Sequence, residues 1–88
     1  MNKIFTISNV KGLHARAAAK LVKAIDKFID DEITVSKDGL SVSGHSIMGL
    51  MMLGASFNTK IEVSCNTKNS FEILSIIEDL IDAKFYED

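Results

Sequence analysis

The stretch EITVSKDGLSVS, residues 32–43, restricts the possible folds of this chain more than any other segment does. Apolar and polar residues alternate on both sides of Asp38–Gly39, over residues 32–37 and again over residues 40–43. An Asp-Gly pair between two alternating runs is the strongest short-range signal for a β-hairpin. The sequence therefore predicts two antiparallel strands joined by a two-residue turn.

On either side of this hairpin, the spacing of apolar residues in each remaining segment indicates either a strand or a helix. The expected elements are a strand at 3–8, a helix from Ala15 to the acidic residues 30–32, a helix within 44–56 that opens at Ser46, a strand at 60–65, and a last helix that begins near Asn69 or Ser70. Asn69 and Glu72 have the spacing of a capping box, in which both side chains close the start of that last helix.

The resulting order is β-α-β-β-α-β-α, and such strands and one-sided helices bury their apolar faces against each other. We expect a fold of the α+β class: an open-faced β-sandwich in which a four-stranded antiparallel sheet carries three helices on one face. The chain has 88 residues, so we expect one domain, 1–88, with a modest core.

Composition excludes several classes of protein. No apolar run approaches the roughly 20 residues of a membrane span, and no N-terminal signal peptide is recognisable. The single cysteine, Cys65, permits no internal disulfide, which favours a reducing cytoplasm. Two histidines and one cysteine make a structural metal site improbable, and we expect no cofactor.

Charge is unevenly distributed along the chain. Residues 1–29 hold six basic residues and one acidic residue, a net charge of +5, whereas residues 30–88 have a net charge of −7. Such asymmetry is typical of a protein that steers a charged partner. The basic part contains only two aromatic residues, Phe5 and Phe28, and the chain as a whole is mildly acidic, so we do not expect nucleic acid to be that partner.

The stretch KGLHARAAAKLVK, residues 11–23, places His14 and Arg16 at the start of the first expected helix, just after Gly12. The first N–H groups of a helix are unpaired and its dipole is positive there, so this end attracts phosphate. Arg16 adds a planar donor group suited to phosphate oxygens, and an imidazole nitrogen can accept a phosphoryl group. The spacing alone does not exclude a simpler interpretation, in which His14 is an ordinary polar turn residue.

Two motifs resemble those of the HPr family, the histidine-containing phosphocarriers of the bacterial phosphotransferase system. GLHARAAAKLV (12–22) is similar to the family's active-site signature, Gly-Leu/Ile/Met-His-Ala/Thr-Arg-Pro-Ala/Ser, and SIMGLMMLGA (46–55) is similar to its second signature. The resemblance covers the whole chain, because the spacing of the motifs, the hairpin between them and the element order also agree. One departure is Ala17, which stands where the family usually has proline. Another is Asn58, where many relatives have a glycine.

The resemblance implies that His14 accepts phosphate from phosphorylated enzyme I and passes it to enzyme IIA for sugar uptake. Arg16 would contact the phosphoryl group. Such a protein is a stoichiometric carrier, not an enzyme in the strict sense. The resemblance also implies that a serine kinase/phosphatase regulates the protein at Ser46, and that a catabolite-control transcription factor binds it, in hosts that have these partners. We expect a cytoplasmic monomer that does not insert into membranes.

The helix after Ser46 is apolar on nearly all sides. Leu50 and Leu53 best fit a core, which would leave Ile47, Met48 and Met51 at least partly exposed. An exposed apolar patch indicates a docking surface, and methionine suits one that fits several partners. The resemblance places docking there too, beside a basic helix face that includes Lys20 and Lys23.

Two other functions remain open at this point. One is a related carrier of the nitrogen branch of the phosphotransferase system, which serves regulation instead of transport. The other is an interaction module of the same fold that carries no phosphate. Members of that last kind typically lack the histidine, so the presence of His14 argues against it.

Overall fold

The computed structural model describes residues 1–87, and its elements occur in the order expected from the sequence. The strands and helices are β1 Asn2–Thr6, α1 Ala15–Ala24, β2 Ile33–Lys37, β3 Leu40–Ser43, α2 Ile47–Met52, β4 Lys60–Cys65 and α3 Ser70–Asp82, with short 3₁₀ turns at Asp26–Phe28 and Lys84–Tyr86. The four strands form one antiparallel sheet in the order β1-β4-β2-β3. The predicted open-faced sandwich is confirmed.

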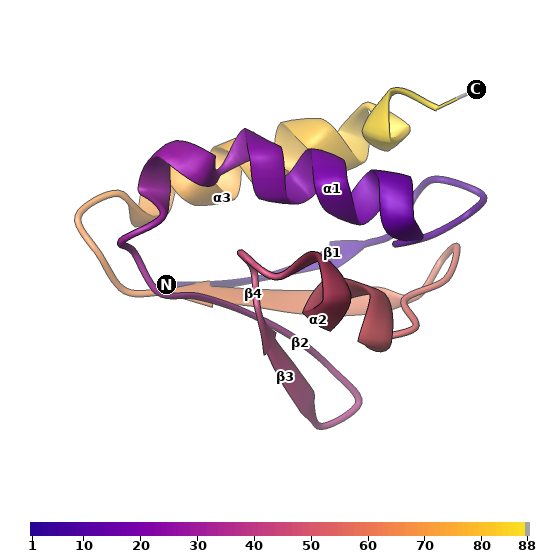
Figure 1. Ribbon diagram of the computed structural model, residues 1–88, viewed down its shortest axis with the longest axis horizontal. Coiled ribbons are helices and arrows are strands. Elements are labelled where there is room, and N and C mark those ends of the chain that lie inside the picture. The colour runs from indigo at the N-terminus through magenta and orange to yellow at the C-terminus, as the bar shows by residue number, and fades with distance from the viewer. Residues whose placement is uncertain (88) are drawn as a thin grey trace.

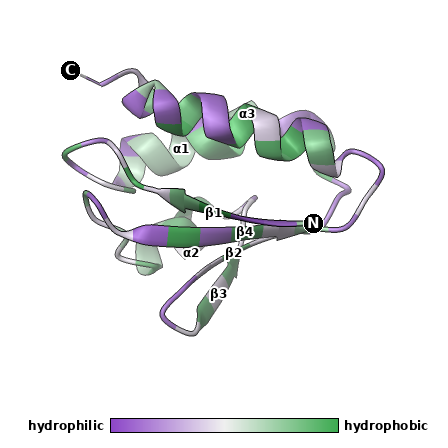
Figure 2. Ribbon diagram, turned by 180° about the vertical axis from the view of Figure 1, so that it is seen from behind, coloured by the Kyte–Doolittle hydropathy of each residue, from purple (hydrophilic) through white to green (hydrophobic). Residues whose placement is uncertain are grey.

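The hairpin turns at the predicted position. Asp38 and Gly39 both have positive φ, 50° and 85°, as a tight two-residue turn between antiparallel strands requires. The register then aligns Val42 with Val35, and Val35 with Val63, on the face that points toward the helices. Apolar and polar residues alternate along β4 as the strand crosses the sheet (Figure 2).

The helices cover one face of the sheet and leave the other open (Figure 1). Helices α1 and α3 lie side by side above the strands, whereas the shorter α2 packs against α1 and β3. A Cβ added at Gly49 of α2 would lie 3.0 Å from the Val42 side chain, which shows how closely α2 approaches β3. The core lies between these two layers and includes Leu21, Ile77 and Val35, all fully buried.

Three details differ from the sequence-based expectation. Helix α1 ends at Ala24, because Ile25 (φ −109°, ψ 14°) leaves the helical conformation and a 3₁₀ turn follows; Ile29 is then exposed instead of facing the core. Helix α2 opens after Ser46 as predicted but covers only Ile47–Met52 of the apolar segment 44–56. The capping box at Asn69 is wrong: the Asn69 side chain makes no capping bond, and its Nδ2 donates to Asp31 Oδ2 at 2.8 Å.

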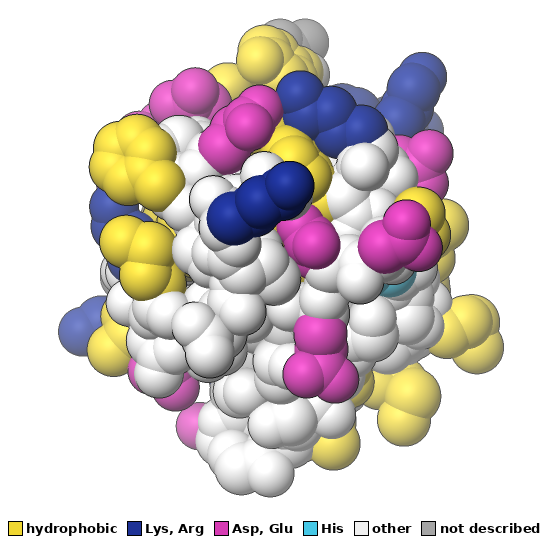
Figure 3. Space-filling view, turned by 90° about the vertical axis from the view of Figure 1, so that its left-hand side faces the viewer, with side chains coloured by type: hydrophobic (Ala, Val, Ile, Leu, Met, Phe, Trp, Pro, Cys, Tyr) yellow, Lys and Arg dark blue, Asp and Glu magenta, His cyan; other side chains and the backbone are white. Residues whose placement is uncertain are grey.

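The start of α1 and the loop before it lie at one end of the molecule (Figure 1). At the opposite end, acidic and basic side chains are interspersed among uncharged groups (Figure 3). Among the helices of residues 1–87, none is long and apolar enough to cross a membrane.

Candidate functional site

The loop before α1 is fixed against the segment that follows α2. Gly12 has φ 69°, and a Cβ at this position would lie 2.4 Å from the Ala55 carbonyl oxygen, so only glycine fits. The Leu13 N–H donates to that same oxygen at 2.9 Å. Asn9 is buried and its Nδ2 donates to the Gly12 carbonyl at 2.8 Å, which closes the loop. The position of the next residue, His14, is therefore set by rigid contacts.

His14 is the N-cap residue of α1. Its backbone is extended (φ −76°, ψ 179°) and its carbonyl accepts the first helical hydrogen bond, from the Ala18 N–H at 2.9 Å. The imidazole makes no capping bond, so the ring is available to other partners, and 28% of the side chain is exposed. Within residues 1–87, no acceptor binds the backbone N–H groups of Ala15, Arg16 or Ala17. The ring thus lies beside a positive helix terminus with free donors.

A carboxylate far away in the sequence contacts this ring. Glu87 Oε2 is hydrogen-bonded to His14 Nε2, and Glu87 Oε1 accepts from Asn9 Nδ2 at 2.9 Å. The Asn9 hydrogen bond is the main reason why the pKa of Glu87 lies below its usual value. The hydrogen bond from His14 and the electrostatic effect of the neighbouring His14 and Lys20 side chains also lower the pKa of Glu87, whereas burial raises it. Glu87 is therefore ionised at neutral pH.

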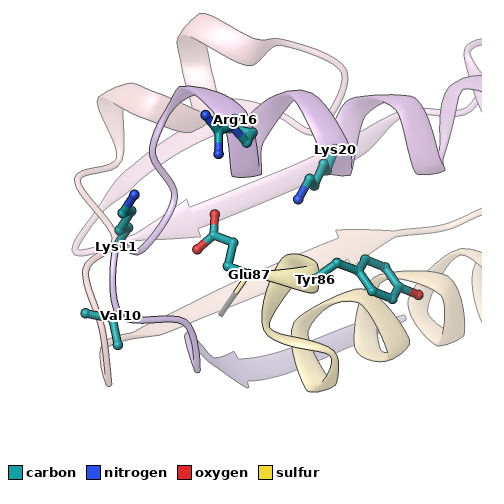
Figure 4. Close-up of a pocket in the computed structure, with 6 residues that line it drawn as sticks. All are labelled: Val10, Lys11, Arg16, Lys20, Tyr86 and Glu87. Atoms are coloured by element: carbon teal, nitrogen blue, oxygen red, sulfur yellow. The ribbon is translucent and has the colours of Figure 1, made fainter.

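A basic pocket of about 430 Å³ lies next to this contact (Figure 4). Its lining includes Lys11, Arg16 and Lys20, with the Glu87 carboxylate projecting between them. Lys20 Nζ donates to the Phe85 carbonyl at 2.6 Å, whereas Arg16 is exposed and forms no ion pair with the other described residues. His14 and residues 54–56, among others, line a smaller depression. The surroundings of His14 can accommodate an anion of phosphate size.

Helix α2 presents an apolar surface to solvent. Leu50 and Leu53 are buried as predicted, and Ile47, Met48 and Met51 are 40%, 71% and 42% exposed. Met52 is also exposed, at 67%. Helix α2 packs against α1, so the exposed apolar side chains of α2 lie on the element next to the one that carries Lys23. The sequence therefore predicted correctly which side of this helix faces the core.

Ser46 caps α2, and its Oγ accepts from the Gly49 N–H at 2.9 Å.

The other polar candidates outside the His14 site have structural roles. His45 is half-buried, with Nε2 bonded to the Asp31 carbonyl at 2.9 Å. Cys65 is buried. Residues 1–87 contain no group of three or more His, Cys, Asp or Glu side chains placed to hold a metal ion.

Glu87 and Asn9 were missed by sequence reasoning. His14 and Arg16 could be found because the helix start, the glycine and the cation are neighbours in the sequence. Glu87 is 73 residues from His14 and belongs to no periodic pattern, so only the folded chain brings the two side chains together. Asn9 resembles an ordinary turn residue, and only its burial indicates more.

Comparison with known proteins connects this geometry to one family. The family model for the PTS HPr component phosphorylation site matches residues 1–83. The chain is 40% identical over 83 residues to the phosphocarrier protein HPr of Xylella fastidiosa strain Temecula1, covering 94% of this chain and 92% of that protein. It is 41% identical over 81 residues to the HPr of Neisseria meningitidis serogroup A, covering 92% and 90% of the two chains.

Solved structures agree with these sequence matches. The crystal structure of HPr-C-His from Thermoanaerobacter tengcongensis superimposes with a TM-score of 0.92 at 38% identity, over 100% of this chain and 98% of the other. The phosphocarrier protein HPr of Bacillus anthracis superimposes with a TM-score of 0.84 at 30% identity, over 92% and 95% of the two chains. The likeness thus extends through the whole fold as well as the motif around His14.

Proposed function

The chain belongs to the HPr family of phosphotransferase-system phosphocarriers, and from this premise we propose that it accepts a phosphoryl group on His14 from phosphorylated enzyme I and passes it to enzyme IIA for sugar uptake. The observation that carries the proposal is the placement of a partly exposed imidazole beside the unpaired N–H groups of Ala15, Arg16 and Ala17. A newly bound phosphoryl group would find donors there without any rearrangement of the helix.

In the transfer, a lone pair on an imidazole nitrogen of His14 forms a bond to phosphorus while the bond from phosphorus to the donor breaks. The positive end of α1 and the Arg16 guanidinium stabilise the transferred charge. The dipole contributes roughly 0.3–1 kcal/mol, and at most about 2 kcal/mol. Such a modest stabilisation suits a carrier, because the group has to be released to the next protein. The chain is then a stoichiometric intermediate regenerated by its partners.

Docking is assigned to α2 and the neighbouring face of α1. Ile47, Met48 and Met51 supply exposed apolar contacts, and Lys20 and Lys23 supply positive charge. Apolar anchors give contact area, whereas the lysines attract a partner with an acidic face. Both features serve enzyme I and enzyme IIA in turn, in the cytoplasm.

Ser46 is a regulatory site in this proposal, in hosts that have the serine kinase. Its hydroxyl lies at the N-terminus of α2 beside the docking residue Ile47. A phosphate there would add a charge of about −1.5 to −2, which the N-terminus of a helix tolerates. The added charge would instead repel an acidic partner, and so would slow transfer through His14 without unfolding α2.

The test is to incubate the protein with phosphoenolpyruvate, Mg²⁺ and a cognate enzyme I, and to assay acid-labile, base-stable phosphate. We expect label on the wild type and on His45→Ala, and none on His14→Ala. His45 is the matched control because it is the other histidine of the chain. Label that persists on His14→Ala would refute the assignment, and an unlabelled wild type would favour an interaction module. Transfer to a sugar-specific or a nitrogen-branch enzyme IIA then separates the two branches.

A further inference from the structure

Helix α2 has a glycine, Gly49, at its third position, where a short helix gains nothing from one. Glycine is among the poorest helix formers, and a helix of six residues has few hydrogen bonds to offset that weakness. Gly49 does not use the conformational freedom of glycine either, because its φ is not positive. The reason for a glycine here therefore lies in the space that its missing side chain leaves.

That space lies between β3 and the hydroxyl of Ser46. A Cβ at position 49 would lie 3.0 Å from Val42 Cβ, 3.1 Å from Ser46 Oγ and 3.3 Å from Ser46 Cβ. These distances are shorter than ordinary van der Waals contact, so the neighbouring atoms would have to move. Glycine thus allows α2 to pack on β3 and also keeps the surroundings of Ser46 Oγ open.

Position 49 is the one from which a side chain commonly reaches back to the N-cap residue. In a capping box, a Glu or Gln three residues after the N-cap serine accepts from the backbone N–H of that serine. Here the Ser46 N–H donates instead to the Ser43 carbonyl at 3.1 Å, and Gly49 contributes only its own N–H, to Ser46 Oγ at 2.9 Å. The hydroxyl therefore has a backbone donor beside it and no carboxylate from position 49.

The chain around Ser46 carries no formal charge. Residues 39–59 contain no Asp, Glu, Lys or Arg, and the His45 ring is engaged with the Asp31 carbonyl through Nε2 at 2.9 Å. Within residues 1–87, the backbone N–H groups of Ile47 and Met48 have no acceptor. A phosphate on Ser46 would thus meet free donors and no like charge in this stretch, so the space at position 49 becomes the main steric condition for it.

We propose that Gly49 is a specificity-determining residue for phosphorylation of Ser46, because its missing side chain leaves the space that the hydroxyl and the incoming phosphoryl group require. The inference rests on the proposed regulation of Ser46. In the reaction, Ser46 Oγ forms a bond to the γ-phosphorus of a nucleoside triphosphate, and the bond from that phosphorus to the nucleoside diphosphate breaks. The Oγ proton passes to a base of the kinase. A Cβ 3.1 Å from Oγ would crowd the nucleophile and one side of the phosphorus.

The alternative is that Gly49 serves packing alone. In that case the contact with Val42 is the only important one, and a variant would lose phosphorylation only through a loss of stability. Val42→Gly removes the Cβ that lies closest to position 49 and leaves Ser46 Oγ where it is. The two roles therefore predict different results for Gly49→Ala in a Val42→Gly background.

The experiment measures kcat/KM for phosphorylation of Ser46 by a purified HPr serine kinase with ATP and Mg²⁺, together with thermal unfolding. We expect Gly49→Ala to lower kcat/KM about tenfold or more. Gly44→Ala is the matched control and should change kcat/KM little: its Cβ would lie 2.9 Å from the Ile33 side chain, and its nearest neighbours include no atom of Ser46. In the Val42→Gly background, Gly49→Ala should not lower the Tm further, yet should lower kcat/KM to the same extent.

The outcomes separate this inference from the function on which it rests. The role of Gly49 is overturned if kcat/KM is unchanged in Gly49→Ala, falls equally in Gly44→Ala, or recovers in the Val42→Gly background; the regulation of Ser46 then still stands. A wild type that is phosphorylated on His14 by enzyme I but never on Ser46 overturns the proposed regulation and this inference together. If Gly49→Ala alone fails to fold, the comparison within the Val42→Gly background still decides.

Discussion

At the scale of single residues, the loop around His14 depends on an asparagine as much as on the histidine. Asn9 Nδ2 donates to both the Gly12 carbonyl and Glu87, and so connects the turn before α1 with the segment that follows α3. The loop before α1 and the segment that follows α3 meet at this buried amide. Stability and site geometry are therefore coupled through one side chain.

Asn9→Ala should lower the free energy of unfolding by about 1–3 kcal/mol, because it removes two hydrogen bonds of a buried amide, to the Gly12 carbonyl and to the Glu87 carboxylate. Urea denaturation followed by circular dichroism measures this loss. Asn9→Asp is the sharper variant, because it places a second carboxylate against Glu87. It should be less stable than Asn9→Ala at neutral pH and recover as the pH falls. Equal stability of the two variants at all pH values would contradict the contact.

The ionisation of Glu87 makes a separate prediction about pH. Its pKa is lower in the folded protein than its usual 4.5, so folding is favoured by the ionised form. This contribution is fully present above pH 4.5 and is lost as the pH falls through the folded-state pKa. The groups that face this carboxylate are His14, Lys20 and the other cations of the pocket, Lys11 and Arg16.

Comparing unfolding of the wild type with that of Glu87→Gln between pH 7 and pH 3 isolates this contribution. The wild type should be more stable at pH 7, and the difference should shrink toward zero at the acid end. A difference that is constant over the whole range would show that the glutamine variant fails for a reason other than charge.

At the scale of elements, the sequence predicted those features that depend on neighbours in the chain. Alternation located the strands, and Asp38–Gly39 located the turn, because its two positive φ values are a local requirement. The start of α3 was predicted correctly, whereas the end of α1 and the partner of the Asn69 side chain were missed, because tertiary contacts decide them. The Asn69 side chain donates to the Asp31 carboxylate, and the Thr67 hydroxyl accepts from the Asn69 N–H at 3.0 Å.

The same division applies to the site. His14 and Arg16 could be predicted because a helix start attracts anions irrespective of the rest of the fold. Glu87 could not be predicted, since its arrival depends on the burial of Phe85 and on three residues with positive φ. No local propensity favours such a turn in Lys-Phe-Tyr.

The effect of alanine at position 17, where the family usually has proline, can be tested directly in α1. Ala17→Pro should raise the free energy of unfolding by roughly 0.4–1 kcal/mol, because proline restricts the unfolded chain and Ala17 is in the first turn, where its N–H has no acceptor among residues 1–87. Ala19→Pro, two residues further on, is the control and should cost about 3 kcal/mol. Thermal unfolding measures both. A lower Tm for Ala17→Pro would mean that its fully buried site cannot accept the ring.

At the scale of the whole molecule, the basic residues of α1 and the exposed apolar side chains of α2 lie on neighbouring elements. The basic residues are concentrated in positions 1–29, and the exposed side chains of α2 lie on a helix that packs against α1. The remote end has charges of both signs (Figure 3). In the proposed function, we expect these two features to attract a partner that has an acidic face beside an apolar one.

The apolar part of this surface is tested by Met48→Ala, with Phe71→Ala on α3 as the matched control. Met48 and Phe71 are 71% and 75% exposed, so both variants should keep their stability within about 0.5 kcal/mol. If α2 docks partners, kcat/KM for phosphorylation by enzyme I should fall about fivefold or more in Met48→Ala. It should not change in Phe71→Ala. Equal effects of the two variants would remove α2 from the docking surface.

The electrostatic part is tested by Lys23→Glu against Lys60→Glu, because both exposed lysines change the net charge by the same amount. Attraction by total charge would slow transfer equally in the two variants. Attraction by a local basic face should slow it only in Lys23→Glu, since Lys60 lies on β4 and Lys23 on α1. The deficit should shrink as salt rises from low to physiological concentration, where the Debye length is about 8 Å. A deficit that persists unchanged in high salt would indicate lost contacts instead of lost steering.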